Sequence, residues 1–204
     1  MAVTVCLIVG AASLALASFG DKLWTVELPG RPWRSSPAIS ANGTLYIGAT
    51  SGTANLTAVA PDGTKQWSVK VGASSIYSSP AISANGTVYI GTPDGNLTAV
   101  APDGTREWMI NLRTSSAIQS SPTISSNGTI YIVARGGAAG NLTAVAPSGT
   151  REWMIKIDSS ASYGSPAIAA NGTIYIGTTS GNLTAVAPDG TREWTVQGTN
   201  RGHR

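Results

Sequence analysis

The chain of 204 residues has the length of one ordinary domain, but only 11 % of its residues are charged and 6 % are aromatic. A net charge of +3 is too small for binding nucleic acid through its phosphates. The single cysteine, Cys6, excludes an intramolecular disulfide, and the single histidine, His203, lies beside the C-terminal residue, where it excludes most histidine-based catalytic devices.

Residues 1–20 form an apolar segment that has two interpretations. As a secretory signal or membrane anchor, it would use the apolar stretch Leu7–Leu16, although no Lys or Arg precedes this stretch. As a diverged partial blade, it would follow the register of the repeats described below, because Ala15, Gly20 and Trp24 have the spacing found there. Both interpretations stay open.

Residues 21–196 consist of tandem units of about 42 residues. The sequence Ser-Pro-Ala-Ile-Ser-Ala-Asn-Gly-Thr recurs with small changes around Pro37, Pro80, Pro122 and Pro166. The units are rich in Val, Ile, Thr, Tyr and Gly, and they lack the 3.6-residue periodicity of helices. This pattern predicts an all-β protein, a β-propeller of four-stranded antiparallel blades. We expect four full blades and a partial N-terminal one, as an incomplete ring or as part of a larger propeller.

The second unit illustrates the strands that we expect in each blade. Three of its strands are predicted at Ser79–Ser83, Thr87–Gly91 and Leu97–Ala101, and a fourth carries Trp108. The sequence Ala-Asn-Gly before the second strand predicts a hairpin with a type I′ turn, because Asn and Gly tolerate positive φ angles. The third strand has apolar residues on both faces, which predicts a sheet packed between two neighbours.

One tryptophan recurs at the end of each unit. We expect these rings to pack between blades, where they bury a large area, and not to form a carbohydrate platform. The tryptophans concerned are Trp24, Trp67, Trp108, Trp153 and Trp194.

The segment Ala99–Trp108, with the sequence AVAPDGTREW, resembles the tryptophan-docking signature of the PQQ-like (pyrroloquinoline-quinone-like) β-propeller repeat family. The preceding Asn-Gly-Thr-Val-Tyr-Ile-Gly-Thr is similar to the second strand of that family, and the resemblance covers residues 22–196. It implies a ring of seven or eight blades, and it points to the non-enzymatic branch that resembles the outer-membrane assembly lipoprotein. Quinoprotein enzymes of the family carry a vicinal cysteine pair, which this chain lacks. We therefore expect no catalytic, cofactor-binding or metal-binding residues and no cofactor.

The segments before the first strand of each unit differ most between the units, so any specificity is expected there. Trp33 stands where the other units have Ile76, Ile118 and Ser162, and it lies between two arginines, a combination that is enriched in binding surfaces. The candidate binding surface consists of Arg31, Trp33, Arg34, Tyr77, Gln119 and Tyr163.

Two Asn-X-Thr sequons occur in every unit, and they are candidate N-glycosylation sites. Because the units are near-copies, the eight sequons amount to two observations repeated four times. The Asn-Gly sequons are Asn42, Asn85, Asn127 and Asn171, and the sequons before the third strand are Asn55, Asn96, Asn141 and Asn182.

The leading functional interpretation is a non-catalytic scaffold for protein–protein interaction, located in the cell envelope or outside the cell. A structural or cell-surface repeat protein that self-associates through unpaired blade edges is the first alternative, and a fragment of a larger quinoprotein-like propeller is the second. We expect a protein partner and no nucleic acid, and membrane contact only if residues 1–20 are an anchor. Residues 197–204 form a basic tail.

Overall fold

The protein is described by a computed structural model in residues 22–32, 34–73, 75–112, 117–136, 139–157 and 164–198. The predictions made for residues 1–20, for Trp33 and Tyr163 and for most of the basic tail lie outside these ranges. Within them the secondary structure is entirely strand and turn, and no helix has the length and apolar character that crossing a bilayer requires.

In the described residues, sixteen strands form four antiparallel sheets, and each sheet follows the chain order of its strands. Blade 1 contains β1 (Ala38–Ile39), β2 (Leu45–Thr50), β3 (Ala54–Val59) and β4 (Lys65–Gly72). Blade 2 contains β5 (Ala81–Ile82), β6 (Val88–Gly91), β7 (Asn96–Val100) and β8 (Arg106–Asn111). Blade 3 contains β9 (Thr123–Ile124), β10 (Ile130–Gly136), β11 (Ala139–Val145) and β12 (Arg151–Lys156). Blade 4 contains β13 (Ala167–Ile168), β14 (Ile174–Gly177), β15 (Asn182–Val186) and β16 (Arg192–Gln197).

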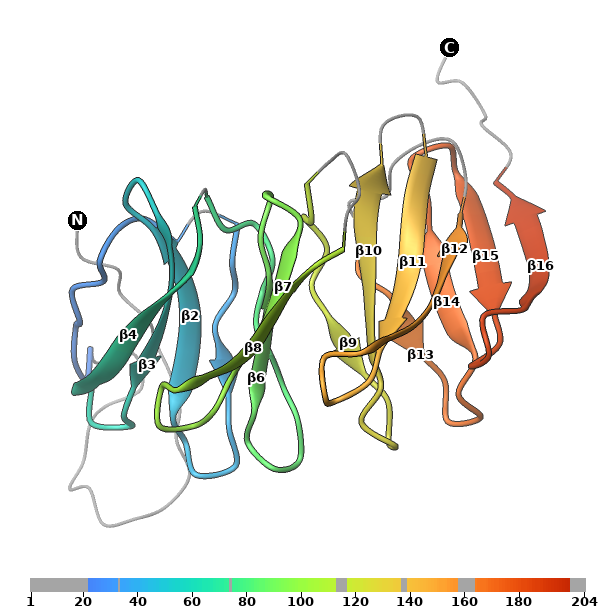
Figure 1. The fold of residues 1–204 in the computed structure, drawn as a ribbon. Helices are drawn as coiled ribbons and strands as arrows, with labels where there is room; N and C mark the ends of the chain where they lie inside the picture. The colour runs from blue at the N-terminus through green and yellow to red at the C-terminus, as the bar shows by residue number, and fades with distance from the viewer. Residues whose placement is uncertain are drawn as a thin grey trace.

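The four blades stand face to face in chain order (Figure 1), and the two-residue strands β1, β5, β9 and β13 contact one another along one side. The predicted propeller of four-stranded blades is therefore confirmed, in the form of a partial ring that does not close. The first strand of each blade is shorter than predicted, since only the two residues after the Ser-Pro sequence or its counterpart pair with the second strand.

Alternation along the strands gives every internal blade two apolar faces. In blade 2, Val88 and Ile90 pack against blade 1, whereas Tyr89 and Leu97 pack against blade 3. These side chains are almost fully buried, and each stabilises the fold by about 1.5–3 kcal/mol relative to an exposed position. The expectation of a sheet packed on both faces is confirmed for blades 2 and 3.

The Asn-Gly hairpins differ from the predicted type I′ turn. In blade 2, Gly86 donates its N–H to the carbonyl of Ser83, and among the turn residues only Gly86 has a positive φ, of 88°. This is a three-residue loop in which a type I turn precedes a left-handed glycine. Asn85 keeps a negative φ because its side-chain oxygen accepts hydrogen bonds from the Ser83 hydroxyl and the Thr87 N–H, which close the turn.

In blades 1 to 3, the tryptophan of the fourth strand docks on a Pro-X-Gly turn of the following blade. Trp67 Nε1 donates to the carbonyl of Pro102 at 2.8 Å, and the ring lies over Gly104. A Cβ on Gly104 would come within 2.9 Å of the indole, and its φ of +92° already favours glycine. Trp108 docks on Pro147 and Trp153 on Pro188 in the same way.

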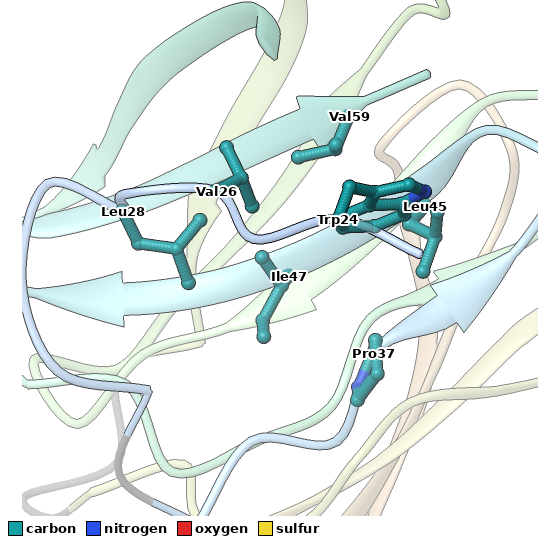
Figure 2. A pocket seen from close by; sticks show the side chains of 7 residues that line it. All are labelled: Trp24, Val26, Leu28, Pro37, Leu45, Ile47 and Val59. Carbon is teal, nitrogen blue, oxygen red and sulfur yellow. The ribbon is translucent and has the colours of Figure 1, made fainter. Parts of the chain in front are cut away.

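The segment 22–28 covers the outer face of blade 1, as Figure 2 shows. Trp24 Nε1 donates to the carbonyl of Pro61 at 2.9 Å, which repeats the contact that β4 makes with blade 2. Trp24, Val26 and Leu28 enclose a small apolar space together with Leu45, Ile47 and Val59. This segment thus takes the position of a fourth strand that precedes blade 1.

The Pro-Asp-Gly-Thr turns make the stability of the fold depend on pH. The carboxylates of Asp62, Asp103 and Asp189 each accept the N–H of the threonine two residues later at 2.8 Å. These hydrogen bonds lower the pKa of each aspartate below its ordinary value of 3.8. Each pKa is therefore lower in the folded chain than in the unfolded chain. The stabilisation from these hydrogen bonds is complete at a pH above the ordinary pKa, and it is lost as the pH falls through the lowered pKa.

We expect the melting temperature to fall as the pH is lowered below about 4. A variant with serine at all three positions, the residue that the third unit already carries at Ser148, should show a shallower decrease. Differential scanning calorimetry between pH 7 and pH 2 measures both slopes. Parallel curves for the two proteins would show that these turns do not contribute.

Candidate binding pocket at the inner strands

Serines that precede the inner strands connect neighbouring blades. The backbone N–H of Ser36 donates to Ser79 Oγ at 2.9 Å, that of Ser79 to Ser121 Oγ at 2.8 Å, and that of Ser121 to Ser165 Oγ at 2.9 Å. Units 2 and 3 therefore each accept one hydrogen bond from the unit before and donate one to the unit after, whereas unit 1 only donates and unit 4 only accepts. This series of bonds fixes the spacing of the blades along their inner side.

A second serine, immediately before the first, anchors each internal segment to its own blade. Ser78 Oγ donates to the carbonyl of Gly91 at 2.8 Å and accepts the N–H of the same residue. Ser120 makes the equivalent pair of bonds with Val133. In blade 1 the equivalent Ser35 hydroxyl is buried and has no hydrogen-bond partner.

The residue before these two serines points into a pocket of about 260 Å³ at this end of the blades. Three successive units contribute Arg34, Tyr77 and Gln119, and Ser121 and Ser165 complete the lining. The guanidinium carbon of Arg34 lies 5.9 Å from the centre of the Tyr77 ring, a distance that allows a cation–π interaction. We call this the inner-strand pocket; its described lining combines one positive charge, one aromatic ring with a hydroxyl group, one amide and two serine hydroxyl groups.

Arg34 is held in a costly backbone conformation. Its φ of 60° is the only positive value at a non-glycine residue in the described ranges, and such a conformation costs on the order of 1 kcal/mol. No carboxylate of the described residues lies within ion-pair distance of Arg34. The conformation directs an exposed, unpaired cation toward the pocket.

The structure brings together three of the six residues in the predicted binding surface, namely Arg34, Tyr77 and Gln119. Arg31 is not part of the pocket lining: its backbone forms an antiparallel bridge with Thr50, and its side chain is exposed. Trp33 and Tyr163 lie outside the described residues. The pocket serines were missed as site residues, although a serine immediately before the proline in every unit was the signal that could have revealed them.

The two classes of sequon lie in different surroundings. The four asparagines of the Asn-Gly turns are exposed, whereas Asn55, Asn96, Asn141 and Asn182 are half-buried. The side-chain nitrogens of Asn55 and Asn96 also donate hydrogen bonds to neighbouring residues. N-glycosylation stays a prediction, and these contacts favour the turn sites, Asn42, Asn85, Asn127 and Asn171, as its acceptors.

Several solved structures share this fold. The crystal structure of BamB from Moraxella catarrhalis matches with a TM-score of 0.64 at 20% identity, covering 80% of this chain and 48% of that one. A europium-containing methanol dehydrogenase matches with a TM-score of 0.66 at 16% identity, and the match covers 79% of this chain and 41% of the dehydrogenase. A protein of unknown function from Bacteroides caccae matches with a TM-score of 0.59 at 13% identity, and the match covers 88% of this chain and 72% of that protein. The chain thus spans about half the length of the BamB chain and less of the dehydrogenase.

The residues present do not fit a quinone with its calcium ion. Such a site requires several oxygen ligands, carboxylates above all, around one position. Among the described residues that line the inner-strand pocket there is no carboxylate, and Arg34 carries the one charged side chain. Across the part of the chain that the structure describes, no three His, Cys, Asp or Glu residues lie close enough together to hold a metal ion. We derive no oxidation step for this chain.

No curated protein sequence matches the chain significantly. The model of a PQQ repeat family, described as outer membrane protein assembly factor BamB, matches residues 12–203. This match covers most of the chain and agrees with the blade structure and with the tryptophan docking between blades. The chain belongs to this family of PQQ-like β-propeller repeats.

Proposed function

We propose that the chain is a non-catalytic scaffold of the cell envelope that binds a protein partner at the inner-strand pocket. The observation that carries the proposal is the gathering of Arg34, Tyr77 and Gln119 in one pocket. These residues occupy the repeat position at which near-identical units differ, while the serines around them keep their structural role. The family description and the fold shared with BamB support an envelope location and a protein partner.

The chemistry of the pocket favours a partner segment that carries a carboxylate. Arg34 offers a guanidinium with no carboxylate partner among the described residues, and a guanidinium forms bidentate hydrogen bonds with carboxylates. The Tyr77 ring beside it offers an apolar surface with a polar end. Gln119 and the pocket serines offer further donors and acceptors for a peptide backbone. Arginine and tyrosine are also the residue types that most often dominate the energy of protein interfaces.

Photo-crosslinking in the native host tests this proposal. A photoreactive phenylalanine derivative replaces Gln119 in the pocket or, as a matched control, the exposed Gln66 on β4. We expect a defined adduct with another envelope protein at the first position and none at the second. Equal labelling at both positions, or a chain found in the cytosolic fraction, would contradict the proposal.

Charge reversal at Arg34 provides a second measurement. Arg34→Glu should lower the yield of the adduct by about tenfold or more, which corresponds to the loss of one strong interface contact. Arg31→Glu introduces the same charge only three residues away and outside the pocket lining, so it should leave the yield unchanged. An equal loss in both variants would show that net charge, and not the pocket, governs binding.

The methanol dehydrogenase fold leaves a quinoprotein fragment as the alternative, and a titration separates the two functions. On the scaffold proposal, pyrroloquinoline quinone with Ca²⁺ should leave the absorption spectrum of the mixture equal to the sum of its components. A saturable spectral shift would overturn the non-catalytic assignment.

A further inference from the structure

The last blade presents an apolar face that its counterparts bury. Leu183 on β15 is 43% exposed, whereas Leu56, Leu97 and Leu142 at the same repeat position are fully buried. On β16, Trp194 is 41% exposed and Val196 is 58% exposed. In every preceding blade the equivalent tryptophan docks on the next blade. Blade 4 thus carries one complete half of an interface that the chain forms three times internally.

The complementary half of that interface exists on blade 1. Its outer face consists of Leu45, Ile47 and Val59 together with the Pro61–Gly63 turn, and among the described residues it is segment 22–28 that covers this face (Figure 2). A whole blade covers the equivalent face of blade 2. The cover on blade 1 is incomplete, because Ile39 is 48% exposed while the equivalent Ile82 packs in the core between blades 1 and 2.

The two segments that compete for this face share a sequence. Trp24-Thr25-Val26, which lies on blade 1, is identical to Trp194-Thr195-Val196, which lies exposed on β16. Trp24 occupies the same kind of Pro-X-Gly turn that Trp67, Trp108 and Trp153 occupy. The face of blade 1 therefore accepts the β16 sequence without any new type of contact.

We propose that two copies of the chain associate head to tail, so that blade 4 of one copy docks on the outer face of blade 1 of the other. Trp194 and Val196 then replace Trp24 and Val26 on blade 1, and segment 22–28 is displaced. Blade 4 buries more apolar area on this face than segment 22–28 does, because it also brings Tyr175 and Leu183. These two residues correspond to Tyr46 and Leu56 at the internal interface. Burial of additional apolar surface, including Ile39, provides the driving force.

This contact joins two different surfaces, so each copy retains one free half of the interface after pairing. Such head-to-tail contacts produce a closed ring when the rotation between copies closes, and an open chain otherwise. The association does not depend on the proposed partner, because the inner-strand pocket lies outside both surfaces. It also differs from pairing through strand edges, since sheet faces meet and no backbone ladder is extended.

Sedimentation velocity over a range of concentrations tests the proposal. The full chain should exceed its monomer mass of 20.7 kDa as the concentration rises. Trp194→Ser should remain monomeric, and Trp24→Ala, which weakens the internal cover, should shift the midpoint to concentrations at least about tenfold lower. Met154→Ser is the control, because this side chain is 41% exposed but lies on β12, outside both surfaces. The association midpoint of this variant should match that of the wild type.

A mixing experiment tests the head-to-tail geometry. Ile39→Lys blocks the blade 1 face and Trp194→Ser removes the blade 4 face, so each variant alone should be monomeric. Their mixture should form a dimer and no larger species, because only one productive contact can form. Unchanged association of the Trp194→Ser variant, or a wild type that is monomeric at all concentrations, would overturn the proposal. Circular dichroism of each variant verifies that the blades are folded.

Discussion

Replacing Trp108 by alanine is expected to lower the free energy of unfolding by about 3 kcal/mol. The ring lies between blades 2 and 3: its Nε1 donates to the carbonyl of Pro147, its face covers Gly149, and its centre is 5.6 Å from that of Tyr89. The substitution removes this packing and leaves the Pro147 carbonyl without its partner. Urea denaturation followed by circular dichroism measures the loss.

Trp194→Ala is the matched control for this prediction. It removes the same residue type with the same tyrosine neighbour, Tyr175 at 5.8 Å, but the indole docks on no turn of the described residues and is 41% exposed. We expect a loss of about 1 kcal/mol or less, measured at a concentration at which the chain is monomeric. Similar losses at both positions would show that docking on the next blade contributes little. Because blades interact only with their neighbours, Trp108→Ala should also broaden the transition.

Leu142→Ala is expected to lower the free energy of unfolding by about 3–4 kcal/mol. Leu142 on β11 is fully buried in the core between blades 3 and 4, where a cavity cannot be filled without moving two sheets. Thermal and urea unfolding measure the effect. The substitution leaves the inner-strand pocket intact, so it separates stability from partner binding.

Leu183→Ala provides the comparison at the same repeat position. Leu183 is 43% exposed on the open face of blade 4, so its removal should cost less than about 1 kcal/mol in the monomer. A loss as large as that of Leu142→Ala would mean that blade 4 is packed against something other than blade 3. The pair thus tests whether the last blade is open in solution.

The fold was predictable from the sequence because the same signals recur in every unit. Asn-Gly and Asp-Gly turns separate the strands, and one tryptophan per unit indicates which surfaces meet. The turn type was not predictable, since the Asn85 side chain closes a three-residue loop through its own hydrogen bonds. Strand ends were also missed: β5 is limited to Ala81–Ile82 because the N–H of Ser79 bonds to Ser121 of the neighbouring blade and Pro80 has no N–H to pair with β6.

The candidate site was only partly predictable. Comparison of the units identified Arg34, Tyr77 and Gln119, because these residues vary where their surroundings are constant. It also grouped Arg31 with them through closeness in sequence, although Arg31 pairs with Thr50 and does not line the pocket. The role of Ser121 and Ser165 depends on contacts between residues more than 40 positions apart, which a local pattern does not contain.

The serine bonds along the inner side have a consequence for how such a chain can change its length. Every unit brings both a donor N–H and an acceptor hydroxyl at the same place, so this hydrogen bond does not depend on which two units meet. Duplicating or deleting one unit in the gene would leave each remaining junction chemically complete. In evolution, a chain built in this way can gain or lose whole blades without new side chains at the junctions between blades.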